Sequence, residues 1–396
     1  MTQSSIFFEN DISAQPGLLE SHWTNNPSLI FVPDKIGTGR DWLEHAARQL
    51  PTALRSECFG ILTSGSTGEP KLVIGSKQRS QQLVRVLHEF QDSNRVVESV
   101  CALPLSYSYA FVNQWLWAHV FGRRLHLTHG FSEPDTLQTA LAEAEYAALC
   151  LVGTQVPLIR RFFPDAVFPG IIRLHFAGGR FPQEHLDFLR ERFPNAQIYN
   201  NYGCAEAMPR LTLRRAEDAS EAANVGHPLP GVELRSDDDK RLLFRSPYRA
   251  VAIVDDAGFR PIADDEWLPT GDLGEPVGDG SWRLLGRANE VFKRHGEKIS
   301  LASLLTSVRA HWSGDAAFYR EADPQGEESC VLVLSPQPDE GQLRALLQVF
   351  RKHYTRPHWP IRIESLAQLP LLPNGKPDLV GLKSAPDKQL HWRQRI

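Results

Sequence analysis

The segment from Leu62 to Val73, with the sequence LTSGSTGEPKLV, contains the residue types that bind an anion. Hydroxyl residues alternate with glycines and a lysine follows, at Ser64, Gly65, Ser66, Thr67, Gly68 and Lys71. Glycine lets the backbone approach an anion closely, amides and hydroxyls donate hydrogen bonds to phosphate oxygens, and lysine adds positive charge. A Walker loop would have four residues between its glycines and then Lys-Ser or Lys-Thr, so this segment is not one. These residues predict a phosphate-binding loop, although a plain surface turn between two strands has a similar composition.

The elements around this loop are predicted from hydrophobic patterns. An apolar stretch from Cys58 to Leu62 predicts a strand into the loop, and Leu72 to Ile74 predicts a strand out of it. From Pro134 onward helical and strand patterns alternate, with helices expected at 134–144, 156–163 and 182–193 and strands at 147–152, 171–176 and 196–199. Alternation at this spacing is typical of parallel sheet units.

Two segments near these elements have the composition of a ligand site. Asn200 to Glu206, with the sequence NNYGCAE, directly follows the last predicted strand. Polar residues beyond the carboxyl end of a parallel strand are where ligands of such sheets bind. Pro104 to Gly122 is rich in aromatic residues and has no acidic one. Most of it is expected to be core, and it is also a plausible wall of an apolar pocket.

The last part of the chain has a different pattern. Short strands and turns dominate from Val225. The final segment then predicts a helix at 301–312, a strand at 330–334, a helix at 342–354 and a strand at 361–364. This is enough for a separate α+β domain of about a hundred residues.

Composition excludes several functional classes. The chain has 396 residues, 42% of them hydrophobic, and a formal net charge of −4, so no basic field is available for nucleic acid or an anionic membrane. Its five cysteines are scattered without CxxC spacing, which suggests neither a zinc site nor a disulfide framework. The N-terminal sequence does not resemble a secretory signal, and no apolar run is long enough to span a bilayer. We therefore expect a soluble, cytoplasmic enzyme.

The motifs form an ordered series. TSGSTGEPK, NNYGCAE, VGHPLPG, TGDLG, GRANEVFKRHGEKI and LPNGKPD occur between about Ile61 and Asp378 in the order found in the adenylate-forming superfamily. The chain resembles that superfamily, which includes acyl- and aryl-CoA synthetases, firefly luciferase and the adenylation domains of peptide synthetases. Members use ATP and magnesium to convert a carboxylate into an acyl-adenylate with release of pyrophosphate. Most then transfer the acyl group to the thiol of CoA or of a carrier-protein phosphopantetheine.

The resemblance implies roles for individual residues. Nucleotide-binding positions match Thr63, Ser64, Gly65, Ser66, Thr67, Gly68, Lys71, Gly178, Gly179, Asn201, Tyr202, Gly203, Asp272 and Arg287. Glu206 matches the magnesium ligand, and Asp272 the residue that accepts hydrogen bonds from both ribose hydroxyls. Lys376 matches the lysine that bridges the substrate carboxylate and the α-phosphate in the transition state. Outside this series, an exposed lysine after Asn-Gly would be read as a turn.

The resemblance also implies a fold and a domain movement. We expect an α/β fold, with a large N-terminal domain at 1–288 that has mostly parallel sheets flanked by helices plus a small β-rich subdomain. A small, mobile α+β domain at 289–396 would follow and would swing between adenylation and thioester formation. Asn289 occupies the hinge position, and Lys293 and Gly296 match the loop presented to the active site after the swing. Without the resemblance they would be ordinary linker residues.

Three departures from the family pattern stand out. Ala205 replaces the Thr or Ser that usually precedes the magnesium ligand, so one donor to the α-phosphate is lost. Arg180 follows the Gly-Gly pair where Ala or Glu is usual, which puts a cation near the nucleotide or acyl pocket. Fewer residues precede the phosphate loop than in most relatives. This predicts a compact form with a shortened N-terminus, which a homodimer would complete.

The substrate is expected to be a carboxylic acid without an α-amino group. Peptide-synthetase relatives hold the ammonium with an aspartate in the aromatic-rich segment, and this chain has no acidic residue there. Burying an ammonium without a counter-charge is costly. The substrate-binding residues are predicted to be Tyr107, Tyr109, Trp115, Asn200 and Gly203, and Asn201 could also bond a ring substituent. An aryl acid resembling a hydroxy- or aminobenzoate is the first expectation.

Two other functions fit the same residues. One is a ligase that delivers the acyl-adenylate to an amine or a hydroxyl. The other is a catalytically impaired relative that binds nucleotide without turnover, which the loss of a hydroxyl at Ala205 would favour. A thioester with CoA or a carrier would exclude the first alternative, and its absence would favour it. Pyrophosphate exchange with a good substrate would exclude the second alternative.

Overall fold

The computed structural model describes residues 5–15, 17–25, 29–32, 40–64, 70–371 and 377–394. These form two compact units. The large unit contains Met1–Asp238, Leu242–Thr270 and Glu275–Arg283, and the small unit contains Asp239–Arg241, Gly271–Gly274 and Leu284–Ile396. The expected domain boundary after residue 288 stays a prediction. Within the described residues, no helix combines the length and the apolar composition needed to cross a membrane.

A six-stranded sheet of the large unit holds the two strands beside the predicted phosphate loop. In spatial order it contains β1 (Ser5–Phe8), β2 (Leu29–Val32), β3 (Cys58–Ser64), β4 (Pro70–Ser76), β14 (Ala252–Asp255) and β15 (Gly258–Pro261). The first three are parallel, and β3 pairs antiparallel with β4. Helix α3 (Arg40–Gln49) packs Leu43 and Ala46 against Ile30, Leu72 and Ile74 of this sheet. The strands on either side of the predicted phosphate loop therefore belong to a sheet whose face toward α3 is buried.

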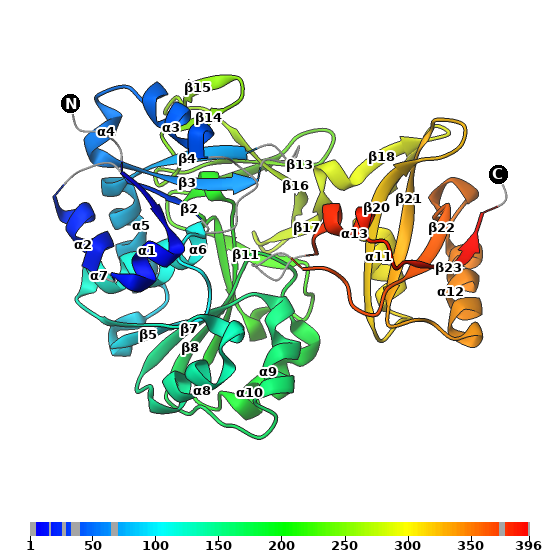
Figure 1. Cartoon of the computed structure of the whole chain (residues 1–396), viewed down its shortest axis with the longest axis horizontal. Coiled ribbons are helices and arrows are strands. Elements are labelled where there is room, and N and C mark those ends of the chain that lie inside the picture. Colours follow the sequence, from blue (N-terminus) through cyan, green and yellow to red (C-terminus); the bar gives the residue numbers. More distant parts are fainter. Residues whose placement is uncertain are drawn as a thin grey trace. The chain divides into compact units, whose positions relative to one another are not determined.

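The eleven-stranded sheet contains the predicted parallel strands (Figure 1). Its order is β12-β13-β16-β17-β11-β10-β9-β8-β7-β5-β6. Five strands at one end of the sheet are parallel to one another. They are β6 (Arg124–Leu127), β5 (Glu98–Cys101), β7 (Ala147–Leu151), β8 (Ile171–Phe176) and β9 (Gln197–Tyr202). The rest of the sheet contains β10 (Thr212–Arg215), β11 (Asn224–Pro228), β12 (Glu233–Ser236), β13 (Arg241–Arg245), β16 (Leu268–Pro276) and β17 (Trp282–Arg287). The predicted α/β fold, with large sheets and a small C-terminal sheet, is confirmed.

Helices cover both faces of the parallel strands because the side chains of each strand alternate between the faces. On one face, Leu149, Leu174 and Ile198 pack against the apolar sides of α8 (Pro134–Glu143), α9 (Val156–Phe162) and α10 (Leu186–Arg192). The alternate residues Ala148 and His175 lie opposite α5 (Lys77–Phe90) and the helix of residues 108–121. Ser76 begins α5 by accepting a hydrogen bond from the backbone N of Arg79.

The aromatic-rich segment forms this last helix, which has an irregular middle. It contains α6 (Ser108–Ala110), a π-helical stretch (Phe111–Leu116) and α7 (Trp117–Phe121), and it ends at Gly122, whose φ is +59°. Gln114 fixes the helix to the sheet by donating to Ser99 Oγ at 2.9 Å and to the Val100 carbonyl at 2.8 Å. The sheet-facing side of the helix is therefore polar at this point.

The small unit has its own core. Its hairpin of β18 (Val291–Arg294) and β19 (Glu297–Ser300) precedes α11 (Leu301–Arg309), and its four-stranded sheet has the order β20-β21-β22-β23. The bounds are β20 (Asp315–Ala322), β21 (Glu328–Ser335), β22 (Arg362–Ser365) and β23 (Gln389–Arg393), with α12 (Glu340–His353) and α13 (Leu379–Ser384). Leu304, Leu332 and Phe350 lie in the buried core between α11, α12 and the sheet.

Candidate active site

The predicted phosphate loop connects two paired strands. Thr63 on β3 lies opposite Lys71 on β4, and its hydroxyl donates to the Lys71 carbonyl at 3.3 Å. Ser64 lies opposite Pro70, so both ends of the loop are held by the ladder. The predicted residues Gly65, Ser66, Thr67 and Gly68 lie outside the described residues.

Lys71 and Glu206 are in direct contact. The Lys71 ammonium donates to Oε1 of Glu206, although the two residues are 135 positions apart. Glu206 lies in a single 3-10 turn, Ala205–Ala207, shortly after β9, and its backbone carbonyl accepts from Ala250 N at 2.8 Å. The side chains are 24% and 16% exposed, so both remain accessible to a ligand. The structure thus brings together the lysine and the glutamate that the sequence assigns to phosphate and magnesium.

These residues fit a magnesium ion held mainly by its substrate. Among the described residues, no group of three or more His, Cys, Asp or Glu side chains is arranged around a common point. A cation at Glu206 would therefore have at most two such side chains of the described residues as ligands. Magnesium is commonly bound in this way, by one or two carboxylates together with substrate phosphates and waters.

Tyr202 and Gly203 lie at the carboxyl end of β9, tight against the following loop. A Cβ at Gly203 would be 2.0 Å from the Pro209 carbonyl oxygen and 2.8 Å from Arg210 N, which only glycine avoids. Leu211 N donates to the Tyr202 carbonyl at 2.8 Å. The segment that matches the adenine and acyl pockets is therefore fixed directly beside the backbone of Arg210.

Asn200 and Asn201 lie within β9, whereas the sequence predicted that the strand ends at Tyr199. Both are buried. Asn200 Nδ2 donates to the Asn224 carbonyl at 3.2 Å, and Asn201 Nδ2 donates to the Tyr109 hydroxyl at 2.7 Å. The strand continues because β10 pairs with it antiparallel, with Leu213 opposite Asn201.

The three predicted aromatic residues have different environments. Tyr109 contacts Asn201, and burial raises its pKa well above the ordinary value, so its hydroxyl stays protonated. Tyr107 is half-buried and follows a turn whose Leu105 and Ser106 amides donate to the Glu9 carboxylate at 2.8 and 2.7 Å. Trp115 stacks on Phe111 and His119 in an aromatic cluster with Trp23. The structure therefore joins Tyr109 to the β9 residues and gives Trp115 core contacts.

The Gly178–Gly179 pair follows the end of β8. Gly178 has a φ of +74°, a conformation that favours glycine, and no heavy atom lies within 4 Å of a Cβ built at Gly179. The pair is thus an open turn beyond the carboxyl end of a parallel strand. Arg180 forms an exposed ion pair with Glu184 at 2.5 Å. Its charge is balanced within its own turn.

Asp272 and Arg287 form an ion pair in the small unit. Arg287 Nε lies 3.0 Å from Asp272 Oδ1, and the two residues come from the neighbouring strands β16 and β17. Asp272 is 10% exposed and Arg287 is 47% exposed. Burial raises the pKa of Glu290, which also lies near this pair. The structure brings together the two residues assigned to ribose and phosphate contact.

The predicted hinge and thiol-loop residues lie in and beside the β18–β19 hairpin. His295 and Gly296 form its two-residue turn with φ values of +49° and +83°, as in the turns that match the twist of paired strands. Lys293 is exposed and lies opposite Lys298. Asn289 accepts from Arg320 Nη1 at 2.8 Å through its carbonyl. The sequence did not predict this hairpin, because its alternating pattern is only four residues long on each side.

Lys376 lies outside the described residues. The residues on either side of that segment, Leu371 and Pro377, form an antiparallel bridge.

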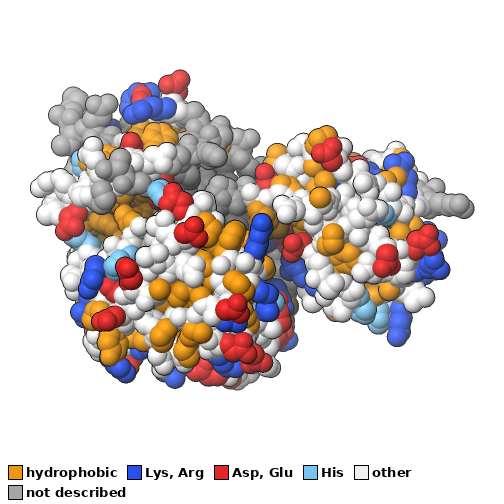
Figure 2. Space-filling model, turned by 60° about the horizontal axis from the view of Figure 1, so that its bottom comes forward, with side chains coloured by type: hydrophobic (Ala, Val, Ile, Leu, Met, Phe, Trp, Pro, Cys, Tyr) orange, Lys and Arg blue, Asp and Glu red, His pale blue; other side chains and the backbone are white. Residues whose placement is uncertain are grey.

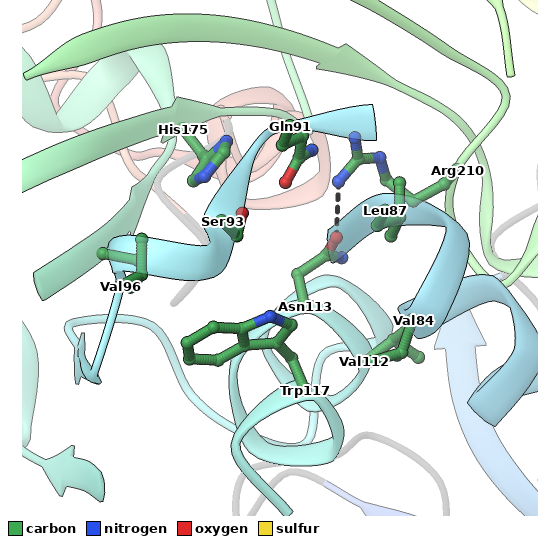
Figure 3. A pocket seen from close by; sticks show the side chains of 11 residues that line it. Val84, Leu87, Gln91, Ser93, Val96, Val112, Asn113, Trp117, His175 and Arg210 are labelled. Atoms are coloured by element: carbon green, nitrogen blue, oxygen red, sulfur yellow. Dashed lines mark hydrogen bonds between the residues drawn. The ribbon is translucent and has the colours of Figure 1, made fainter. Parts of the chain in front are cut away.

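A cavity lined by Arg210 was not predicted from the sequence. Arg210, His175, Gln91 and Asn113 line it together with apolar residues, and in Figure 3 the side chains of Arg210 and Asn113 point toward each other. Arg210 is 1% exposed. The available signal was an arginine within the otherwise apolar stretch after Glu206, AMPRLTL.

Comparison with known proteins identifies a family for most of this chain. The family described as AMP-binding enzyme matches residues 17–244. The chain is 24% identical to tyrocidine synthase 3 of Brevibacillus parabrevis over 93% of its length and 6% of the relative. It is 28% identical to the 2-succinylbenzoate–CoA ligase of Escherichia coli over 67% of its length and 55% of the relative. The chain therefore spans only part of these relatives.

Solved structures with the same fold have low sequence identity to this chain. An o-succinylbenzoate coenzyme A synthetase from Bacillus subtilis, in complex with AMP, matches 96% of the chain and 83% of that structure with a TM-score of 0.70 and 18% identity. The amide bond synthetase McbA from Marinactinospora thermotolerans matches 96% of this chain and 79% of that structure, with a TM-score of 0.68 and 22% identity. At this identity the likeness defines the fold.

Proposed function

Because the chain belongs to the family of AMP-binding enzymes, we propose that it activates a carboxylic acid with ATP as an acyl-adenylate and releases pyrophosphate. The observation that carries the proposal is the contact between Lys71 and Glu206. It joins the end of the predicted phosphate loop to the predicted magnesium ligand across a long sequence separation. A surface turn in an unrelated protein would not need that partner.

The chemistry requires positive charge around the phosphates, because a carboxylate is a poor nucleophile toward an anionic triphosphate. In our proposal Lys71 and the hydroxyl-rich loop bind the β- and γ-phosphates, while Lys376 bridges the acid and the α-phosphate. Asp272 accepts hydrogen bonds from the ribose hydroxyls, held in position by Arg287. Magnesium, bound through Glu206, would neutralise phosphate charge. When the protein holds the acid in line with the α-phosphate, a reaction between two separate molecules becomes effectively unimolecular, which lowers its barrier.

A thiol is the proposed acceptor, on CoA or on a carrier-protein phosphopantetheine. The likeness to CoA ligases supports it, as does an exposed hairpin in the small unit that presents Lys293 and Gly296. We further propose that the small unit is mobile and turns about Asn289 between the two half-reactions. The second candidate is an amine acceptor, which the likeness to an amide bond synthetase favours.

We propose an aryl or acyl acid as substrate, not an α-amino acid. The helix of residues 108–121 contains no Asp or Glu, and its Tyr109 is bonded to the neutral amide of Asn201. An α-ammonium group would therefore have no carboxylate partner on this helix. The open turn at Gly178–Gly179 and the segment Tyr202–Gly203 complete the proposed pocket beside Tyr107 and Asn200.

A two-stage assay tests the proposed function. ATP–pyrophosphate exchange is measured first with aryl acids, short and medium acyl acids and the standard amino acids. Exchange with an aryl or acyl acid is expected, and exchange with α-amino acids alone would overturn the substrate class. The active acid is then incubated with CoA, a phosphopantetheinylated carrier or a simple amine. A thioester supports the thiol acceptor, an amide supports the second candidate, and exchange with no acid supports a catalytically impaired protein.

A further inference from the structure

The cavity that Arg210 lines has both apolar and polar lining residues. It has a volume of about 20 Å³, room for roughly one water molecule, and lies between α5, the helix of residues 108–121 and strands β7 and β8. Val84, Leu87, Val112 and Trp117 are among its apolar lining residues, and Figure 3 shows Gln91, His175 and Arg210 opposite Trp117. The cavity therefore has room for one small polar group, which both apolar side chains and Arg210 would contact.

Arg210 is buried, and no carboxylate among the described residues forms an ion pair with it. Its Nη1 donates to Asn113 Oδ1 at 2.5 Å, and the Gln91 amide oxygen, when turned toward it, accepts from its terminal nitrogens at 2.7 and 3.3 Å. Its Nε is buried without a hydrogen-bond partner, and the same holds for His175 Nδ1 and Asn201 Oδ1. The ionisable groups that act on it, Tyr109 and Cys150, are kept neutral because burial raises their pKa values.

The other buried arginines of the described residues have a compensating environment. Arg173 lies 3.8 Å from the Asp92 carboxylate, Arg249 lies 3.7 Å from Asp264, and Arg294 lies 3.2 Å from Asp323. Arg214 has all its nitrogens bonded, mostly to backbone carbonyls, with Asp218 nearby. An unpaired buried charge is costly. Arg249 and Arg294 also have a buried Nε without a hydrogen-bond partner, so what distinguishes Arg210 is that no carboxylate of the described residues pairs with it.

We propose that Arg210 binds an oxygen acceptor at the far end of the acid substrate, so that the preferred substrate is a carboxylic acid with a second carboxylate or a hydroxyl group. This rests on the proposed function. The link to the reacting end is the backbone, because Arg210 N lies directly against Gly203 in the predicted acyl-binding segment. Tyr109, whose hydroxyl accepts a hydrogen bond from Asn201 Nδ2, acts electrostatically on Arg210.

The donor chemistry of the cavity discriminates among second groups. Guanidinium has five N–H donors and no acceptor, so it binds a carboxylate or hydroxyl oxygen and offers no acceptor to the N–H groups of an amine. The two amide oxygens of Gln91 and Asn113 that face this end already accept from Arg210. A hydroxybenzoate or a dicarboxylic acid therefore fits this end better than an aminobenzoate.

The test compares acids that differ only at the far end. Benzoate, 4-hydroxybenzoate, terephthalate and 4-aminobenzoate are assayed by ATP–pyrophosphate exchange with the wild type, with Arg210→Met and with Arg215→Met. Arg215 is an exposed arginine on β10 and serves as the matched control. In the wild type, kcat/KM for at least one oxygen-bearing acid is expected to exceed that for benzoate by ~10-fold to 100-fold, the usual effect of a hydrogen bond to a charged group. Arg210→Met should bring this ratio close to one, and Arg215→Met should keep it.

A binding measurement keeps the result independent of turnover and of folding. The thermal unfolding midpoint of each folded variant is measured with and without the same four acids. An upward shift with 4-hydroxybenzoate or terephthalate in the wild type, lost in Arg210→Met, supports the proposal and shows which oxygen group is preferred. Equal ratios for all four acids in the wild type, or an unchanged preference in Arg210→Met, would overturn it. If no acid supports pyrophosphate exchange, the proposed adenylation activity is wrong. The shifts of the unfolding midpoint then still show whether Arg210 binds the second oxygen group.

Discussion

Lys71 and Glu206 show how a contact between distant residues gives meaning to side chains that are ambiguous alone. Each is an ordinary surface residue type, and each becomes informative because the other faces it. The residue types of the site were predictable from the sequence, since chemistry restricts which side chains bind phosphate and magnesium. Arg210 was not, because an arginine in an apolar stretch does not reveal whether it is buried or which residues surround it.

Lys376→Ala is predicted to reduce adenylation by a factor of ~10² to 10³ without unfolding the protein, as loss of one preorganised donor to the transition state does. Acyl-adenylate formation is measured for the variant, the parent and the control Lys352→Ala, which removes an exposed lysine from α12. Near-normal turnover in Lys376→Ala would remove this lysine from the mechanism.

His175 is predicted to make the large unit less stable in acid. Burial, with Arg210 and Arg173 nearby, lowers its pKa to about 3. Between pH 3 and 6.5 the unfolded chain binds a proton at this residue and the folded chain does not, so the free energy of unfolding falls as the pH is lowered from 6.5. The slope approaches ~1.4 kcal/mol per pH unit well below 6.5.

The measurement is urea denaturation between pH 5 and 8. His175→Gln should lose about 2 kcal/mol less than the wild type between pH 8 and pH 5, because it lacks the titrating group. His45→Gln, at an exposed position of α3, is the control and should follow the wild type. The same pH dependence for all three proteins would show that His175 does not titrate on unfolding.

At the scale of elements, the sequence predicts a strand well when a local apolar pattern defines its ends. It predicts a strand's length poorly when pairing with another strand determines where the strand ends. The parallel strands β7 and β8 match the predicted ranges closely, since each is a short apolar run between turn residues. β9 is longer than predicted because β10 pairs with its polar end. The π-helical stretch also has no sequence signal; within it Asn113 donates to the Tyr109 carbonyl at 2.9 Å and accepts from Arg210. Such stretches are frequent at functional sites.

Gly296→Phe is predicted to spare adenylation and to reduce thioester formation at least tenfold. The proposal requires the β18–β19 hairpin to lie beside the thiol only in the second half-reaction. Gly326→Phe is a matched control, since Gly326 also has a positive φ, of +85°, and open space around it in the turn between β20 and β21. Pyrophosphate exchange and thioester yield are measured separately. Equal losses of both in Gly296→Phe would contradict the movement of the small unit.

At the scale of the molecule, two sheets of the large unit contribute to one proposed site. Lys71 comes from the six-stranded sheet, and Glu206 follows a strand of the eleven-stranded sheet. The alternation of helical and strand patterns was enough to predict parallel sheet units, and the order of motifs predicted the α/β fold through the family resemblance. The joining of the two sheets depends on contacts between residues far apart in the sequence, which patterns do not show. Acidic and basic side chains are interspersed on the face drawn in Figure 2, in keeping with a small-molecule substrate.

The most direct test of the account is to identify the nucleotide product. The protein is incubated with ATP, magnesium and each acid of the panel, and the quenched reaction is analysed by mass spectrometry. The account predicts AMP and pyrophosphate in equal amounts, an acyl-adenylate mass that depends on the acid, and at least a tenfold loss of both in Lys71→Met. Formation of ADP and phosphate, or AMP release that no carboxylic acid stimulates, would contradict it.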